Sequence, residues 1–204
     1  MDLCNIDTIR AVLGRHGFRF SKSLGQNFLT EAWVPARIAE SCGVDETSCA
    51  LEVGPGMGCL TEQLSKRAGQ VCSIELDRAL FPVLEETLAD CYNVEIVQGD
   101  VLKCDLAGIC REKFGGKPVY ACANLPYYIT TPAITAMLES KAFSAITVMV
   151  QKEVAQRIFH LYRLLRAGGD FVRRAARLLC AAAEGGLCGC PPDSAQRTAG
   201  TGEQ

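Results

Sequence analysis

The chain has 204 residues, a length that accommodates one full α/β domain and little more. Hydrophobic residues make up 49% and charged residues 22%, which is an ordinary globular composition and excludes a disordered chain. No apolar stretch approaches the ~18 residues that span a bilayer. The N-terminus also lacks a basic stretch followed by an apolar one. We therefore expect a cytoplasmic protein without a membrane partner.

The formal net charge of −2 does not indicate a nucleic-acid binder, but the charge is unevenly distributed. Residues 1–30 carry four basic and two acidic side chains, residues 31–158 carry 11 and 17, and residues 159–204 carry six and four. The basic leader 1–30 is a candidate phosphate-contacting segment, and a solvated terminal face explains its charge equally well.

Twelve cysteines are present, without any Cys-x-x-Cys pair. Most of them, such as Cys49, Cys72 and Cys122, lie inside apolar runs. A buried thiol behaves as a small hydrophobic group, and the spacing typical of metal ligands is missing. The sequence therefore predicts core cysteines and no metal site.

Strand and helix patterns alternate along residues 33–150. Short apolar runs predict strands at 50–53, 71–74, 94–97, 119–123 and 146–150. Helical periodicity predicts a partly helical leader up to about Phe20 and helices at 33–41, 60–67, 79–88 and 132–138. This alternation predicts an α/β fold with right-handed crossovers and a mainly parallel sheet.

A glycine-rich turn follows the first predicted strand: Glu52-Val53-Gly54-Pro55-Gly56-Met57-Gly58. Glycines such as Gly54 and Gly56 let the backbone turn sharply and let a ligand approach closely. The spacing is Gly-x-Gly-x-Gly, which differs from the Gly-x-Gly-x-x-Gly of a dinucleotide loop. By itself the pattern fits a nucleotide-like ligand or a tight structural turn.

Acidic residues follow the second and third predicted strands. Glu75 is placed to accept both ribose hydroxyls of an adenosine-containing cofactor. Asp77 is better placed to cap the next helix. Asp100 is placed to accept from an adenine amino group. Because open α/β sheets bind ligands at the carboxyl ends of their strands, we expect Glu75 and Asp100 to share one site.

The fourth predicted strand ends in Asn124-Leu125-Pro126-Tyr127. Proline restricts the residue before it, so the Leu125 carbonyl is held in a fixed direction. The Asn124 side-chain oxygen and that carbonyl can accept both hydrogens of an amine, and Tyr127 offers a face on which a base can stack. Such a set suits adenine N6: it directs the nitrogen lone pair toward a methyl donor without an ionised base. An Asn-Pro turn with a core tyrosine is the structural alternative.

Together these motifs resemble the small-subunit ribosomal RNA adenine dimethyltransferases, the kasugamycin-sensitivity methylases. The resemblance covers residues 10–158 and rests on these segments: Ser23-Leu24-Gly25-Gln26-Asn27-Phe28-Leu29, Glu52 to Gly58, Ile74 to Asp77, Gly99-Asp100, Asn124 to Tyr127 and Gln151 to Ile158.

The resemblance implies a Rossmann-like methyltransferase domain over residues 31–158 that uses S-adenosyl-L-methionine. It implies cofactor contacts at Asn27, Leu29, Gly54, Gly56, Glu75, Asp100 and Asn124. It also implies transfer of four methyl groups to two adjacent adenosines near the 3′ end of 16S rRNA, with the small ribosomal subunit or its precursor as partner. We expect a monomer without a metal.

Two other functions share part of this pattern. A macrolide-resistance methylase acting on 23S rRNA uses the same cofactor and adenine chemistry. A nicotinamide-dependent oxidoreductase would use the glycine turn and Glu75, but it gives Asn124 to Tyr127 no role.

The character of the sequence changes at Phe159. Residues 159–204 hold eight alanines, seven glycines and six arginines, without lysine, isoleucine or asparagine. This text resembles translation in a shifted reading frame, and a divergent tail is the alternative. We expect an amphipathic helix from Phe171 to Ala183, disorder from Gly185, a sheet incomplete at its C-terminal strands, and no C-terminal domain of the family type. An inactive truncated remnant of such an enzyme is therefore the alternative to a working methyltransferase.

Overall fold

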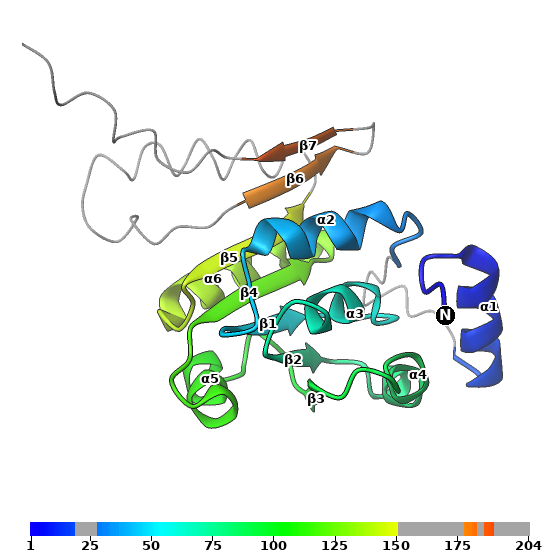
Figure 1. Cartoon of the computed structure of the whole chain (residues 1–204), viewed down its shortest axis with the longest axis horizontal. Coiled ribbons are helices and arrows are strands. Elements are labelled where there is room, and N and C mark those ends of the chain that lie inside the picture. Colours follow the sequence, from blue (N-terminus) through cyan, green and yellow to red (C-terminus); the bar gives the residue numbers. More distant parts are fainter. Residues whose placement is uncertain (19–27, 151–177, 183–185, 190–204) are drawn as a thin grey trace, which may run out of the picture.

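The computed structural model describes residues 1–18, 28–150, 178–182 and 186–189. Its centre is a seven-stranded sheet with the order β3-β2-β1-β4-β5-β6-β7 (Figure 1). The strands are β1 (Cys49–Val53), β2 (Gln70–Glu75), β3 (Val94–Gln98), β4 (Val119–Asn124), β5 (Ala145–Val150), β6 (Leu178–Ala182) and β7 (Gly186–Gly189). Neighbouring strands from β3 to β6 are parallel, and β7 is antiparallel to β6.

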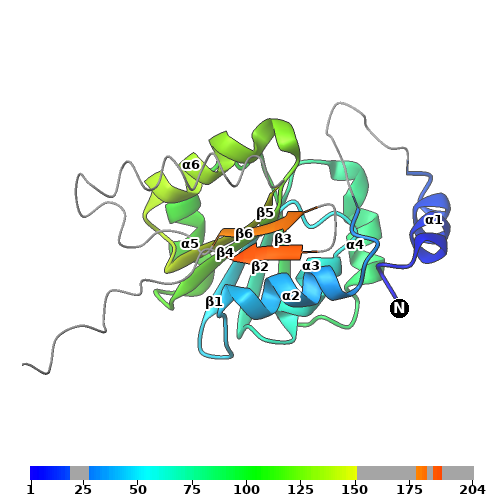
Figure 2. The ribbon, with the colours of Figure 1, turned by 90° about the horizontal axis from the view of Figure 1, so that it is seen from above.

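Helices cover both faces of this sheet. Figure 2 shows α2 and α3 on one side of the strands and α5 and α6 on the other. The helices are α1 (Ile6–Arg15), α2 (Trp33–Cys42), α3 (Cys59–Ser65), α4 (Phe81–Thr87), α5 (Leu106–Phe114) and α6 (Thr130–Ser140), with the 3-10 turns η2 (Arg78–Leu80) and η3 (Tyr127–Ile129). None of these helices is long and apolar enough to cross a membrane.

The predicted α/β fold is confirmed, and every predicted element between residues 33 and 150 has its counterpart. Helix α5 has no counterpart among the predicted elements. Its signals are local: the Asp105 side chain caps it by accepting from the Gly108 N–H at 2.8 Å, and Gly115 ends it with φ 59°. The prediction of core cysteines is also confirmed for Cys49, Cys72 and Cys122, which are buried free thiols.

The structure corrects the expectations for the C-terminal segment in three respects: a strand replaces the expected helix, a second strand lies where disorder from Gly185 was expected, and the sheet has seven strands where an incomplete one was expected. Residues 178–182 form strand β6 where a helix over 171–183 was expected, and β6 pairs with β5 through Val148 and Leu178. A further strand, β7, follows. Five apolar or small residues, Leu178 to Ala182, suit a buried strand as well as a helix, because so short a run carries no distinguishing periodicity. The rest of residues 159–204 lies outside the described residues.

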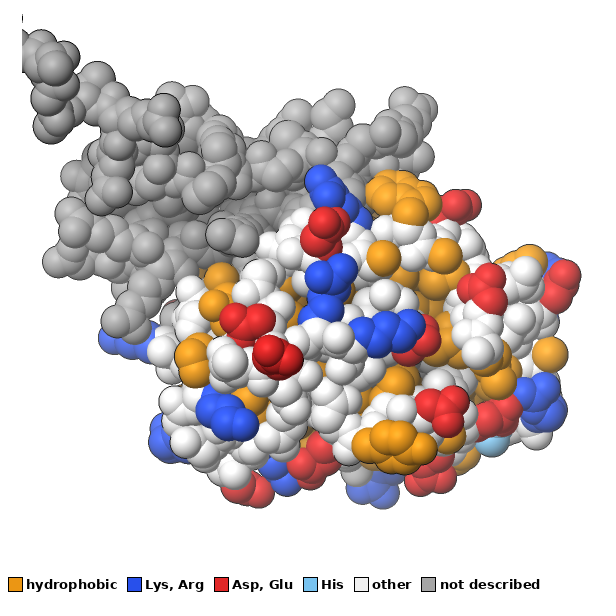
Figure 3. Space-filling view, viewed as in Figure 1, with side chains coloured by type: hydrophobic (Ala, Val, Ile, Leu, Met, Phe, Trp, Pro, Cys, Tyr) orange, Lys and Arg blue, Asp and Glu red, His pale blue; other side chains and the backbone are white. Residues whose placement is uncertain are grey.

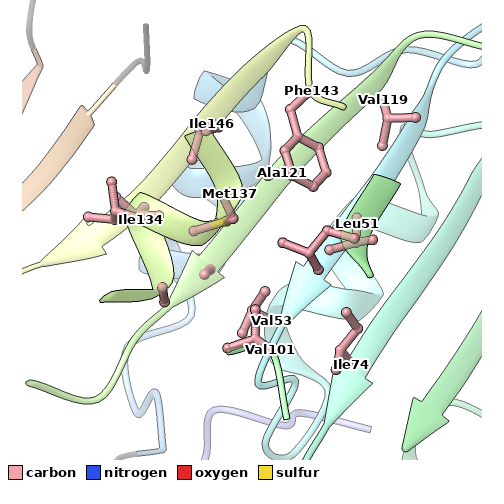
Figure 4. Close-up of a cluster of buried hydrophobic side chains, with 14 of the residues drawn as sticks. Leu51, Val53, Ile74, Val101, Val119, Ala121, Ile134, Met137, Phe143 and Ile146 are labelled. Carbon is pink, nitrogen blue, oxygen red and sulfur yellow. The ribbon is translucent and has the colours of Figure 1, made fainter. Parts of the chain in front are cut away.

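The two faces of the sheet differ in chemistry. On the α5/α6 face, which we call the apolar face, side chains such as Leu51, Met137 and Phe143 form a continuous buried cluster (Figure 4). On the α2/α3 face, the strand register places four buried residues side by side across four strands. This polar row consists of Ser73, Glu52, Cys122 and Thr147.

The N-terminal segment packs against α4. Ile9, Val12 and Leu13 of α1 share a buried cluster with Leu84 and Leu88. The Glu86 carboxylate contacts both Arg15 and His16, with 2.6 Å between the His16 Nε2 and Glu86 Oε2 atoms. The predicted helical leader is therefore confirmed over Ile6–Arg15.

Candidate active site

A sharp turn of three left-handed glycines connects β1 to α3. Gly54, Gly56 and Gly58 have φ values of 72°, 60° and 87°. A Cβ atom at Gly58 would lie 2.9 Å from the Leu88 side chain, so this position requires glycine for space as well as for conformation. The Gly54 N–H donates to the Ile74 carbonyl at 3.0 Å, which joins the turn to β2. The glycine backbone is therefore not covered by side chains of its own, and the hydrogen bond to β2 holds the start of the turn in position.

The carboxyl ends of β1, β2, β3 and β4 surround a cavity of about 260 Å³. Nearly all of the predicted site residues that the structure describes meet there: Leu29, Gly54, Gly56, Glu75, Asp100, Asn124, Leu125 and Pro126. Asn27 lies outside the described residues. Segments that are far apart in the sequence therefore contribute to one site, as expected for an open parallel sheet.

Glu75 is the most deeply held of the predicted cofactor ligands, with only 6% of its surface exposed. Its Oε1 atom accepts from the Asp77 N–H at 2.8 Å, and the backbone N–H groups of Gly56 and Leu76 lie near its carboxylate. Burial raises the pKa of Glu75, and these N–H donors oppose the shift. Its neighbour Asp77 caps η2 by accepting from Ala79 at 3.0 Å, as predicted.

Asp100 follows β3 at the same edge of the sheet. Its Oδ1 atom accepts from the Leu102 N–H at 3.0 Å, and its Oδ2 atom lies 3.3 Å from the Lys103 ammonium. These contacts fix the carboxylate in the wall of the cavity. A carboxylate oxygen has capacity for further donors beyond these two.

The turn after β4 holds its backbone firmly. The Pro126 carbonyl accepts from the Ile129 N–H at 3.2 Å and from the Thr130 hydroxyl at 3.0 Å. A carbonyl has two lone pairs, so Pro126 is satisfied within the turn. The Leu125 carbonyl and the Asn124 side chain precede it at the wall of the cavity.

The two tyrosines after Pro126 differ in position. Both are about half exposed, Tyr127 at 59% and Tyr128 at 55%. Tyr128 lines the cavity, whereas the predicted stacking residue Tyr127 is not among the lining residues. Spacing alone cannot distinguish two adjacent tyrosines, because η3 decides which ring turns toward the cavity.

Apolar side chains without a predicted role also line the cavity, and three of them lie beside the predicted site residues. Leu76 and Leu102 each follow within two residues of a strand-end acid and remain largely exposed at the cavity. Phe28 packs close to Gly56, whose added Cβ would lie 3.3 Å from the ring. The sequence signal for Leu76 and Leu102 is a leucine one or two positions after each strand-end acid.

Metal ligation has no support in the described part of the chain. Within those residues, no group of three or more His, Cys, Asp or Glu side chains is placed to hold an ion. The cysteine nearest the cavity, Cys59, donates to the Leu3 carbonyl at 3.0 Å, and burial raises its pKa. It is therefore a core thiol.

Comparisons with known proteins agree with this geometry. Residues 17–165 match the family model "Ribosomal RNA adenine dimethylase". The ribosomal RNA small subunit methyltransferase A of Shouchella clausii (strain KSM-K16) is 48% identical over 159 residues, which cover 77% of this chain and 54% of that protein.

Two solved structures share both sequence and fold with the chain. The 23S rRNA methyltransferase ErmE is 33% identical with a TM-score of 0.59, covering 67% of this chain and 52% of that one. A dimethyladenosine transferase from Plasmodium falciparum is 29% identical with a TM-score of 0.51, covering 63% and 45%.

The match is broad along this chain but partial along its relatives. The chain spans about half the length of the curated relatives it matches. The family match ends at residue 165, shortly after the point where the composition changes. It nevertheless includes the glycine turn, both strand-end acids and the turn after β4, so the chain belongs to the ribosomal RNA adenine dimethylase family.

Proposed function

We propose that this protein is an S-adenosyl-L-methionine-dependent methyltransferase that dimethylates N6 of two adjacent adenosines near the 3′ end of 16S rRNA. One observation carries the proposal: the Asn124-Leu125-Pro126 turn opens into the same cavity as Glu75 and Asp100. A cofactor site and an amine-binding turn thus share one space in a member of the dimethylase family.

The cavity suits the adenosyl part of the cofactor. Glu75 would accept the two ribose hydroxyls, and Asp100 would accept from the adenine amino group. Leu76 and Leu102 would cover the faces of the adenine ring, while Gly54, Gly56 and Leu29 permit close approach of the remainder. When bound, the cofactor supplies an electrophilic methyl group.

The turn after β4 would orient the target amine. The Asn124 side-chain oxygen and the Leu125 carbonyl accept the two N6 hydrogens, which directs the nitrogen lone pair into the cavity. Both acceptors stabilise the positive charge that develops on N6, and the proton leaves after methyl transfer. The target adenine must leave its stack to reach this position, and Tyr127 or Tyr128 would stack on it.

The small subunit is the better-supported target. The curated relative named for the small subunit is 48% identical, whereas the 23S enzyme ErmE is 33% identical. These relatives act on ribosomal RNA, and we infer that this chain works in the cytoplasm on the small subunit or its precursor, as a monomer.

RNA affinity needs a source of positive charge. The face shown in Figure 3 has basic and acidic side chains interspersed. Arg37 is paired with Glu40 and Lys66 with Glu62, each at 2.8 Å. Arg10 and Arg15 on α1 are also paired, with Asp7 and Glu86, so pairing alone singles out no face. The net positive charge of residues 1–30 makes the basic leader our candidate for phosphate contacts.

Incorporation of tritiated methyl groups into undermethylated 30S particles tests the proposal. We expect incorporation by the wild-type chain and a loss of at least about 100-fold in Asn124→Ala, because one oriented acceptor at a developing charge is worth roughly that factor. Tyr128→Ala and Tyr127→Ala form a matched pair that identifies the stacking ring. The proposal would be contradicted if the wild-type chain incorporates no methyl groups, or if Asn124→Ala retains full turnover.

A further inference from the structure

A buried carboxyl lies directly below the glycine turn, and the proposed mechanism does not use it. Glu52 is 1% exposed and sits on the α2/α3 face of β1, outside the lining of the cavity. Its Oε2 atom accepts from the Thr61 hydroxyl at 2.6 Å and from the Ser73 hydroxyl at 2.7 Å. A polar group buried this completely is costly unless its partners are well placed.

The three partners lie on three different elements around the turn. Glu52 is on β1 just before the turn, Thr61 is on α3 just after it, and Ser73 is on the neighbouring strand β2. The strand register places Glu52 opposite Ser73. One carboxyl oxygen therefore joins both ends of the glycine turn to the strand that ends in Glu75.

We propose that Glu52 is a positioning residue: its hydrogen bonds to Thr61 and Ser73 fix the geometry of the glycine turn that faces the cofactor. The inference rests on the proposed function for its effect on cofactor, but its effect on the turn is independent of it. Met57 anchors the middle of the turn in the core, but the three glycines offer no side chains to pack, so the path of the turn also depends on what holds its ends.

The glycine turn is in contact with the site of Glu75 and so influences the position of that carboxylate. The Gly56 N–H lies near the Glu75 carboxylate, and the Gly54 N–H donates to the Ile74 carbonyl at 3.0 Å. A turn released at its Thr61 end would misplace both donors. Glu52 would thus control cofactor affinity without touching the cofactor.

Hydrogen–deuterium exchange across residues 54–61 tests the inference without any ligand. We expect Glu52→Ala and Thr61→Val to exchange at least about tenfold faster there than wild type, because opening of the turn becomes cheaper. Glu52→Gln keeps an acceptor oxygen, so its exchange rates in this segment should stay within about threefold of the wild-type rates. Leu64→Val, in the same helix, lowers stability without breaking the tie, so it should leave this segment unchanged at matched stability.

Calorimetric titration with S-adenosylhomocysteine then tests the consequence. We expect Thr61→Val and Glu52→Ala to bind at least about tenfold more weakly, with Glu52→Gln close to wild type. Unchanged exchange in Thr61→Val and Glu52→Ala, or equal loss in Leu64→Val, would overturn the inference. If the variants exchange faster but the wild type binds no S-adenosylhomocysteine, the proposed function is contradicted. The role of Glu52 in the turn would then still stand.

Discussion

The same strands form two faces of the sheet that differ in chemistry and in what they support. On the apolar face, alternate residues of β1, β4 and β5 pack against α5 and α6 without any charged or hydroxyl side chain. On the opposite face, the polar row of Ser73, Glu52, Cys122 and Thr147 crosses the sheet beneath α2 and α3. From this difference we expect stability and site geometry to be largely separable. The apolar face holds the sheet together, and the polar row reaches the ends of the glycine turn.

Truncation on the apolar face should have the largest effect on stability. Leu51 is fully buried at the centre of the sheet, on β1. We expect Leu51→Ala to lower the free energy of unfolding by about 2–5 kcal/mol, from lost burial and the cavity it leaves. Urea unfolding measures this. Cofactor affinity of the folded fraction should stay within about threefold, and a much larger loss would show that the two faces are not separable.

The polar row should make stability depend on pH. Burial raises the pKa of Glu52 to about 7 from an ordinary value of 4.5, against the opposing hydrogen bonds from Thr61 and Ser73. Between these values the folded protein holds a proton that the unfolded chain has released, so stability falls as pH rises through this window. The full difference is about 3 kcal/mol.

Glu52→Gln removes this titration and retains the shape of the side chain. Unfolding free energies of wild type and Glu52→Gln, measured at pH 5 and pH 7.5, should diverge by that amount. Burial also raises the pKa of Glu75, which is present in both proteins. Only the difference between their unfolding free energies therefore reports on Glu52. Parallel pH profiles would mean that Glu52 is ionised at a normal pKa.

The edge where the polar face meets the cavity should govern affinity. Glu75→Ala removes the proposed acceptor for the ribose hydroxyls, at a cost of roughly 1.5–3 kcal/mol, or about 10- to 150-fold in affinity. Titration with S-adenosylhomocysteine measures it. Asp77→Ala is the matched control, since that carboxylate caps η2 and is absent from the cavity lining. Equal losses in both variants would remove Glu75 from the site.

The far end of the polar row should show the smallest effect, with the opposite sign. The Thr147 hydroxyl is buried and has no hydrogen-bond partner among the described residues. Thr147→Val replaces it with a methyl group and should stabilise the protein by up to about 1 kcal/mol, because an unpaired buried hydroxyl is unfavourable. Thermal melting checks this. A clear loss of stability would indicate that the hydroxyl is satisfied in solution.

The sequence predicted the layers and most of the site for physical reasons. Strand ends that carry Glu75, Asp100 and Asn124 meet because parallel strands end at one edge. What it missed depends on three-dimensional detail. The choice between Tyr127 and Tyr128 follows from η3, and the role of Glu52 follows from a register with Ser73 that no local pattern reveals. Residues 178–182 read as helix because a short apolar run suits either structure.

The most direct test of the account is a pair of calorimetric titrations of the wild-type chain, one with S-adenosylhomocysteine and one with NAD. The cavity bounded by the glycine turn, Glu75, Asp100 and Asn124 should bind S-adenosylhomocysteine saturably at one site per chain and should bind NAD weakly or undetectably. Saturable binding of NAD without binding of S-adenosylhomocysteine would contradict the assignment of this cavity to a methyltransferase.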